Sequence, residues 1–587
     1  MPGSVASPEL SCDGTNLMRH RVLKQTRAYG WLFFLAAFLA PVAPLAAQTF
    51  VSSGVSATAE QVSIVSDALP AAISSLIKEG QPLEAAGRWA EALSFYEEAL
   101  REHPHDSALQ SRFDVARLHY SLEQRYADRS FRNSVQSLSG RQTLDLYGDL
   151  LNKISAHYYT NPPWQDLVRR GAHSMDIALA DETFLSSHTV RANRPQVDQL
   201  RVEITNLANR YAIRSQSDAM AVAGQIARLS RERVGLSETA TLLEFTAAAA
   251  TALDNYSAFL TADQLRDIYS QIEGNFVGLG VELKADDGAL LIVHVIPNSP
   301  AEREGIKDGD RIVAVDGQAT RDLSTDEAAS LLTGEEGSSV RVTTVTDGQP
   351  PRELVVQRAH VEVPSLEGVK IIDPQTGVAY VRIPAFQKTT ARDLEAALWD
   401  LHGKGMRSLI VDLRGNPGGL LTASVEVADK FIASGPIVST RGRSEQENFN
   451  YQAHRPGTWR VPLVVLIDGD SASASEIFAG AIKDSGRGKI VGTRSYGKGS
   501  VQGIFPLGSS GAGARLTTAS FYSPNGNPIS KVGISPDIDP RRAKLVAAGD
   551  QAVSDGAHLV GFRGPQESDQ ALEVAIQVAR AEPVAAL

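Results

Sequence analysis

The sequence predicts a multidomain α+β protein, with a helical N-terminal region, a β-rich module and an α/β core in that order. Three observations predict this class. The chain has 587 residues, too many for one hydrophobic core, and its 43% apolar and 21% charged residues are ordinary for a globular protein. Short strands bounded by turns follow one another between residues 276 and 345. Beyond residue 408, buried strands alternate with a helix, as in α/β folds.

Residues 1–47 are predicted to be a secretory signal peptide. Basic residues between Arg19 and Arg27 precede the apolar run Trp31–Ala40, and small residues end the segment at Ala47. The apolar run is about ten residues long, whereas a helix needs roughly 20 to span a bilayer, so a retained anchor is the weaker interpretation. We expect cleavage after Ala47 and export to the periplasm or cell envelope. Either Met1 or Met18 is the start of translation.

The only cysteine, Cys12, lies in this leader, so the mature chain is expected to have no thiol. This excludes a cysteine protease, disulfides and a thiolate zinc site, and it suits an oxidising export compartment. The leader carries a net charge of +2, so its removal takes the net charge from -11 to -13. Such an acidic chain without a basic run argues against nucleic acid as a partner. We expect no metal and no cofactor.

Residues 48–130 are predicted to form a tetratricopeptide-like helical segment, because residues from Gly87 to Pro104 fall at the spacing of that repeat. A further helix is expected from Asp106 to Tyr120, and 121–140 is expected to be a linker. One repeat cannot form a solenoid alone. The segment therefore either packs on the helical part expected over 131–270, or docks an adaptor or a second subunit.

Residues 271–360 are predicted to be an independent β-rich module. Two helices with capping signals are expected, one starting at Ser299 and the other at Ser324–Leu332. Asp316-Gly317 is a hairpin signal. The expected strands are Phe276–Leu283, Leu290–Ile296, Arg311–Val315 and Val340–Val345.

Residues 361–545 are predicted to be the α/β core. Val461–Ile467 reads as a buried strand and Ser475–Lys483 as an amphipathic helix, which places Ser473 at a strand-to-helix corner. The unpaired amides of a first helical turn point toward bound negative charge, so the Ala474 amide is a candidate oxyanion donor.

A second strand, Ser408–Leu413, runs into a glycine-rich loop that ends at Gly418 and Gly419. Glycines let the backbone approach a substrate closely, so one of these two amides is the candidate second donor. Residues 546–587 are expected to form a helical tail, in which Gln570–Ala581 either packs back on the core or tethers a neighbouring molecule.

Ser473 and Lys498 together predict a hydrolase. A serine hydroxyl needs a base, and lysine is a base only when neutral, which requires its pKa to fall from about 10.4 to roughly 7 to 8 by desolvation. The alternative is that the serines before the helix are plain N-caps. Gly492–Lys498 also has the spacing of a phosphate-binding loop, but Gly499 stands where a magnesium-binding Ser or Thr is required.

The segments Asp470–Glu476 and Gly497–Gln502, with 25 positions from Ser473 to Lys498, resemble the carboxyl-terminal processing peptidases, or tail-specific proteases. That family consists of serine endopeptidases. The resemblance implies that Ser473 is the nucleophile, Lys498 the general base and Gln502 the residue that orients the lysine, with Ser471 and Ser475 structural.

The resemblance covers roughly residues 140 to 545 and extends through several further segments. In one of them, Asn255 stands after Asp254 where the family usually has proline, away from the chemistry. The segments are Leu253–Leu260, Val378–Ile383, Asp412–Gly419, Leu516–Gly526 and Gly533–Asp537.

The β-rich module is similar to the circularly permuted PDZ domain found in this family. In such a domain an extended peptide adds to a sheet edge while loop amides hold its terminal carboxylate. Val277, Gly278, Leu279 and Gly280 would form that loop. The alternative is a pair of glycines that only relieves steric strain.

The function predicted from sequence is an exported serine endopeptidase that recognises protein C-terminal tails through its PDZ domain. Its partners would be proteins with extended or apolar tails, and the N-terminal repeat could bind an adaptor or a second copy. Two alternatives remain: an inactive PDZ and repeat scaffold, and a carrier of apolar ligands on the same core fold.

Overall fold

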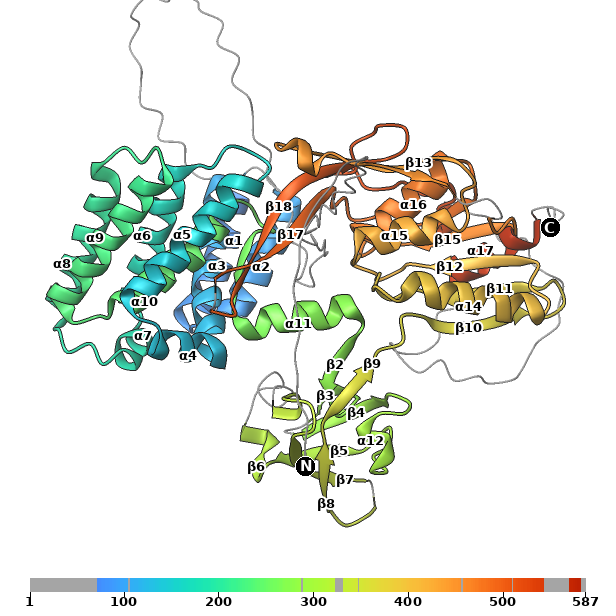
Figure 1. Ribbon diagram of the computed structural model, residues 1–587, viewed down its shortest axis with the longest axis horizontal. Helices are drawn as coiled ribbons and strands as arrows, with labels where there is room; N and C mark the ends of the chain where they lie inside the picture. Colours follow the sequence, from blue (N-terminus) through green and yellow to red (C-terminus); the bar gives the residue numbers. More distant parts are fainter. Residues whose placement is uncertain are drawn as a thin grey trace, which may run out of the picture. The chain divides into compact units, whose positions relative to one another are not determined.

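The computed structural model describes residues 71–103, 106–286, 289–322, 331–346, 348–454, 458–508, 510–542 and 569–581 (Figure 1). The predicted signal peptide and most of the helix expected at Ser324–Leu332 lie outside the described residues. None of the described helices is both long and apolar enough to cross a membrane.

Four helices open the described chain: α1 (Ala71–Ala85), α2 (Trp89–Glu102), α3 (Ser107–Ala127) and α4 (Arg129–Ser137). The first three share a core around the fully buried Tyr96, Leu109 and Phe113. The linker predicted at 121–140 is wrong, because α3 continues to Ala127 and α4 follows at once. Asp128 ends α3 and caps α4, where its carboxylate accepts from the Phe131 amide at 3.0 Å.

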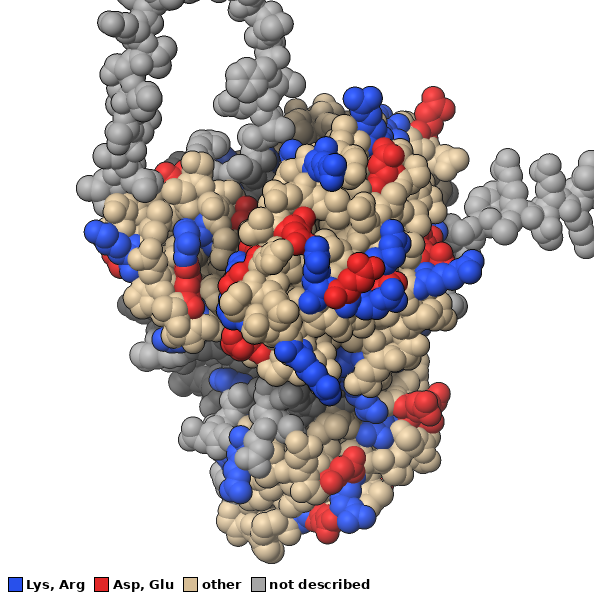
Figure 2. Space-filling model, turned by 90° about the vertical axis from the view of Figure 1, so that its left-hand side faces the viewer, with Lys and Arg blue, Asp and Glu red and all other residues tan. Residues whose placement is uncertain are grey.

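The helical region expected over residues 131–270 is present. Helix α10 lies at its centre, because it is buried along nearly its whole length and packs against α5, α6 and α9. Figure 2 shows acidic and basic side chains interspersed on one face of the protein. The helices are α5 (Gly140–His157), α6 (Trp164–Ala180), α7 (Glu182–Ser187), α8 (Arg194–Arg210), α9 (Gln216–Val234), α10 (Glu238–Thr251) and α11 (Ala262–Glu273).

The β-rich module contains a sheet of order β3-β4-β5-β7-β8, with β6 beside β5, and a separate pair β2-β9. Asp316 and Gly317 both have positive φ, 48° and 82°, which confirms the predicted hairpin turn. The sequence predicted Val340–Val345 as the last strand of the module, but two further strands, β8 and β9, follow it. The elements are β2 (Asn275–Gly278), β3 (Val281–Asp286), β4 (Ala289–Val295), α12 (Pro300–Arg303), β5 (Arg311–Val315), β6 (Gln318–Ala319), β7 (Ser339–Val345), β8 (Arg352–Gln357) and β9 (Ala359–Glu362).

The single strand expected at Phe276–Leu283 is two strands, because the chain turns at Gly280. Gly280 has a φ of 82°, and a Cβ on this residue would lie 2.2 Å from Cβ of Ser299. Only glycine fits such a position without moving its neighbour.

The core is built on a five-stranded sheet of order β10-β11-β12-β15-β16, in which β11, β12, β15 and β16 are parallel. Helices α14, α15 and α16 belong to the main hydrophobic cluster, and α17 covers β12, β15 and β16 (Figure 1). The bounds are β10 (Glu367–Asp373), β11 (Val378–Arg382), α14 (Thr390–Gly403), β12 (Ser408–Asp412), α15 (Leu421–Asp429), β15 (Leu463–Ile467), α16 (Ala474–Asp484), β16 (Lys489–Gly492) and α17 (Gln570–Ala581).

A second sheet joins the helical region to the core. Its order is β1-β18-β13-β14, with β17 paired to β18, and β1 directly follows the turn after α10. The strands are β1 (Ala258–Leu260), β13 (Gly435–Gly442), β14 (Asn450–Ala453), β17 (Ser500–Pro506) and β18 (Gly513–Tyr522).

Candidate active site

Ser473 lies at the corner between β15 and α16, as its sequence context predicts. Its φ of 54° and ψ of -111° are unusual for a residue with a side chain. Such a conformation costs on the order of 1–3 kcal/mol and is kept only where the surroundings impose it. The surrounding backbone therefore holds this serine in a conformation that an ordinary helix cap does not need.

Glu476, in the first turn of α16, holds the corner in place. Its Oε2 accepts the amide hydrogens of Ser473 at 2.8 Å and of Lys498 at 2.9 Å. Its Oε1 accepts from the amide of Gly497 and from the hydroxyl of Ser495, both at 2.6 Å. The carboxylate is fully buried, and burial raises its pKa. The backbones of Ser473 and Lys498 are thus joined through one carboxylate.

The Lys498 side chain is 6% exposed, and its Nζ lies 5.0 Å from the centre of the Tyr256 ring. Burial, together with the positive charge of Arg515, lowers the pKa of Lys498 to about 7, although the negative charges of Glu476 and Asp254 act in the opposite direction. A lysine in this environment is substantially neutral at physiological pH, which general-base catalysis requires.

Gln502, in β17, is 2% exposed. Its Nε2 donates to the Ser500 hydroxyl at 2.9 Å, while its Oε1 is buried and has no hydrogen-bond partner among the described residues. A buried carbonyl oxygen without a partner is costly. Gln502 therefore presents an unused acceptor beside the lysine segment.

The glycine-rich loop is organised by Asn416. The Asn416 Oδ1 accepts from the Gly418 amide at 2.7 Å, and the Asn416 backbone oxygen accepts from the Ala472 amide at 3.0 Å. The Gly418 amide is therefore already engaged in this conformation, which leaves Gly419 and Ala474 as the stronger oxyanion candidates. At Gly419 the φ is 135°, and a Cβ would lie 2.2 Å from the backbone oxygen of Phe386.

The two serines that flank Ser473 have other partners. The Ser471 hydroxyl donates to the backbone oxygen of Leu413 at 2.8 Å, and the Ser475 hydroxyl donates to the backbone oxygen of Asn416 at 3.0 Å. Both serines are fully buried. Their bonds tie the corner to the end of β12 and to the glycine loop.

The residues predicted to bind a peptide carboxylate lie in the β-rich module. Val277 and Gly278 belong to β2, and Leu279 and Gly280 link it to β3. The Leu279 side chain is 1% exposed and packs in the core of the module. A Cβ on Gly280 would lie 2.2 Å from Cβ of Ser299, so steric requirements alone explain the glycine at this position.

Sequence reasoning missed the residues that support the site: Glu476, Asn416, Tyr256 and Arg515. The spacing Ser473-x-x-Glu476 matches a capping box, a signal that could have identified Glu476 as a partner of the Ser473 amide. Tyr256 and Arg515 come from distant segments, so no local pattern marks them. Arg515 is 5% exposed, and its Nε donates to the backbone oxygen of Tyr256 at 2.8 Å.

Comparisons with known proteins agree with this architecture. Residues 377–539 match peptidase family S41 and residues 291–346 match the PDZ domain. The chain is 37% identical over 292 residues to the carboxy-terminal-processing protease of Bartonella bacilliformis, covering 49% of this chain and 66% of that protein. It is 34% identical over 294 residues to the carboxyl-terminal-processing protease of Synechocystis sp., covering 49% and 68%. About a third of each relative thus lies outside the match.

Among solved structures, the photosystem II D1 C-terminal processing protease is 26% identical and covers 68% of this chain and 92% of that chain, with a TM-score of 0.34. The sequence relatives and the S41 match carry the assignment. The chain belongs to the carboxyl-terminal processing proteases, which are serine-type peptidases of family S41 with a PDZ domain.

Proposed function

We propose that this chain is an exported serine endopeptidase in which Ser473 is the nucleophile and Lys498 the general base. The observation that supports this most directly is the joint attachment of both residues to Glu476, together with the burial of Lys498. The arrangement fixes the two backbones and favours a neutral amine. A serine–lysine pair needs a neutral amine held close to the hydroxyl, and these two features support that arrangement.

In the proposed mechanism, neutral Lys498 Nζ takes the proton of the Ser473 hydroxyl while Oγ attacks the scissile carbonyl carbon. The Ala474 and Gly419 amides stabilise the oxyanion of the tetrahedral intermediate. Collapse breaks the C–N bond, and the lysine returns its proton to the leaving amine. Water then attacks the acyl-enzyme with Lys498 again as base, which releases the acid and restores the serine hydroxyl.

Gln502 would assist by accepting a hydrogen bond from Lys498 Nζ. The unpartnered Oε1 supports this role, because a lysine proton would satisfy that buried acceptor. The bond would also fix the direction of the Nζ lone pair toward Ser473.

The PDZ module would select substrates with extended or apolar C-terminal tails. The amides of Val277–Gly280 would hold the terminal carboxylate while the tail adds to the sheet. A variant that lacks residues 271–360 is expected to lose the preference for an apolar tail. Unchanged tail-dependent cleavage by this variant would contradict the role.

The test of the catalytic proposal is cleavage of a loosely folded reporter with an apolar or a charged C-terminal tail. Ser473→Ala and Lys498→Ala are expected to abolish turnover. Ser485→Ala, at the C-terminal cap of α16, and Lys483→Ala, whose side chain is 32% exposed, serve as matched controls and are expected to keep turnover. A serine-directed probe should label the wild type and not Ser473→Ala. Absence of both cleavage and labelling in the wild type would favour the scaffold.

A further inference from the structure

A short turn connects α10 to β1 and carries Tyr256, whose ring faces the catalytic lysine at 5.0 Å. Asp254 shapes this turn. Its Oδ1 accepts from the amides of Tyr256 at 2.7 Å and Ser257 at 2.8 Å, and its Oδ2 accepts from the Ser257 hydroxyl at 3.0 Å. The position of the ring against Lys498 therefore depends on how the turn is held.

The turn is also held from the N-terminal segment. Arg117, on α3, donates from Nη1 to Asn255 Oδ1 at 2.6 Å, across 138 residues of sequence. Proline, which usually occupies this position in the family that the sequence resembles, has no side-chain acceptor. The bond from α3 to the turn therefore depends on Asn255, the residue in which this chain departs from that pattern.

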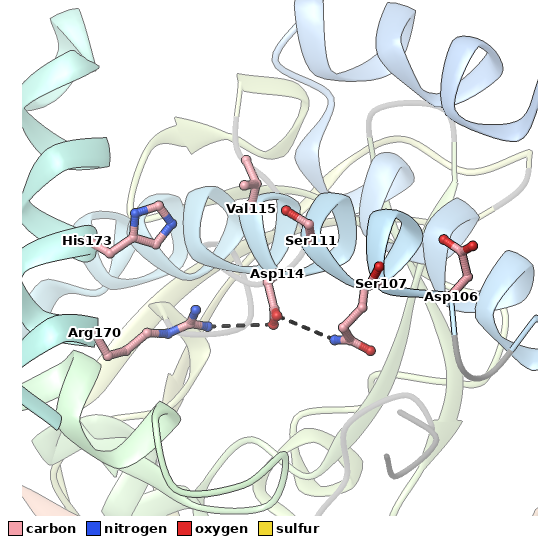
Figure 3. Close-up of a pocket in the computed structure, with 8 residues that line it drawn as sticks. Asp106, Ser107, Ser111, Asp114, Val115, Arg170 and His173 are labelled. Carbon is pink, nitrogen blue, oxygen red and sulfur yellow. Dashed lines mark hydrogen bonds and ion pairs between the residues drawn. The ribbon is translucent and has the colours of Figure 1, made fainter. Parts of the chain in front are cut away.

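Arg117 is itself held by an ion pair on its own helix. Its Nη2 lies 3.3 Å from the Asp114 carboxylate. Asp114 in turn accepts from the side-chain amide of Gln110 at 3.4 Å and lies 3.8 Å from the Arg170 guanidinium on α6. These residues line a surface hollow of about 460 Å³ (Figure 3). The guanidinium of Arg117 thus bridges a fixed carboxylate and the turn beside the lysine.

Arg117 also acts on Lys498 electrostatically, through the charge of Asp254. The negative charge of Asp254 favours protonated Lys498, and Arg117 offsets part of that charge. The groups that act on Lys498 are Arg515, Glu476, Asp254 and the Tyr256 ring. The groups that interact electrostatically with Asp254 are Arg117, Arg515, Lys498, Tyr158, Tyr159 and Tyr256.

We propose that Arg117 is a positioning residue for Lys498, because it fixes through Asn255 the turn that carries Tyr256 and so ties helix α3 to the catalytic centre. This inference rests on the proposed serine–lysine mechanism. It gives the N-terminal helical segment a direct part in setting the state of the catalytic base.

The test compares Arg117→Met, Arg117→Lys and Asn255→Ala in the full chain, with the apolar-tailed reporter. At pH 9, where Lys498 is neutral in every variant, Arg117→Met and Asn255→Ala are each expected to lower kcat by about fivefold to tenfold with KM little changed. The double variant is expected to be no worse than either single one at this pH. Arg117→Met is also expected to move the acidic limb of the pH–rate profile to higher pH. Arg117→Lys keeps the charge and should leave that limb in place.

The matched control is Arg112→Met on the same helix, where Arg112 Nε donates to Glu84 of α1 at 2.8 Å. A similar loss of kcat in this control, or additive effects of Arg117→Met and Asn255→Ala, would overturn the proposal and leave only a packing role.

A second readout does not depend on turnover. The free energy of unfolding should begin to rise with pH near the pKa of Lys498. Arg117→Met should move the onset of this rise to higher pH. No movement would overturn the proposal. Lack of cleavage in the wild type, with Ser473 unlabelled, would instead contradict the proposed function itself.

Discussion

The backbone amides of Ser473 and Lys498 donate to the same oxygen atom, Glu476 Oε2, at 2.8 and 2.9 Å. The two residues are 25 positions apart and lie on different elements, yet one buried carboxylate sets their separation. Since hydrogen bonds to a charged acceptor are stronger than neutral ones, the pair is positioned by the backbone before any substrate contact.

Glu476→Gln should therefore impair both stability and turnover. A glutamine offers one acceptor oxygen where the carboxylate offers two, and each buried amide left unpaired costs about 1–3 kcal/mol. We expect a loss of that order in the free energy of unfolding, measured in urea, and at least a tenfold loss of kcat. The control is Glu244→Gln, also fully buried but in α10. It should lose stability and keep kcat; equal losses of kcat would contradict the positioning role.

The pH dependence of cleavage should follow Lys498. With a pKa of about 7, lowered chiefly by burial, the lysine is protonated and inactive as a base below that pH. We expect kcat/KM to fall about tenfold per pH unit below 7 and to level off above it. The measurement is reporter cleavage between pH 5 and 9. A plateau that continues down to pH 5 would exclude Lys498 as the base.

Replacing Lys498 by Met should stabilise the fold. The pKa of the lysine is lowered from 10.5 to about 7 in the folded protein, so between these values the unfolded chain binds more protons and stability rises with pH. Lys498→Met removes this penalty and should add up to about 4 kcal/mol at pH 7 and about 2 kcal/mol at pH 9. Urea unfolding at both pH values measures the difference. A destabilised variant at pH 7 would show that the lysine is charged and paired.

The sequence predicted the local parts of this site better than the long-range ones. The corner at Ser473 followed from strand and helix patterns, because burial and capping are local properties. The linker at 121–140 was wrong because Asp128 joins two helices without a loop, which composition does not reveal. Arg515 and Tyr256 reach Lys498 only through the pairing of β1 with β18, and no pattern within either segment specifies that pairing.

Helix α17 should be an integral part of the core. Val574 is 4% exposed and packs on the face of the sheet formed by Val378, Ile410 and Val464. Asp569, just before the helix, accepts two hydrogen bonds from Arg414, at 2.8 and 2.9 Å.

Val574→Asp should lower the free energy of unfolding by about 3 kcal/mol or more, because it places an unpaired charge against buried aliphatic side chains. Glu573→Ala, at the exposed neighbouring position, is the control and should change it by less than about 0.5 kcal/mol. Urea unfolding of the two variants beside the wild type gives the comparison. Equal stability of the two variants would mean that α17 does not cover the sheet in solution, and that the buried face is covered by another segment or another molecule.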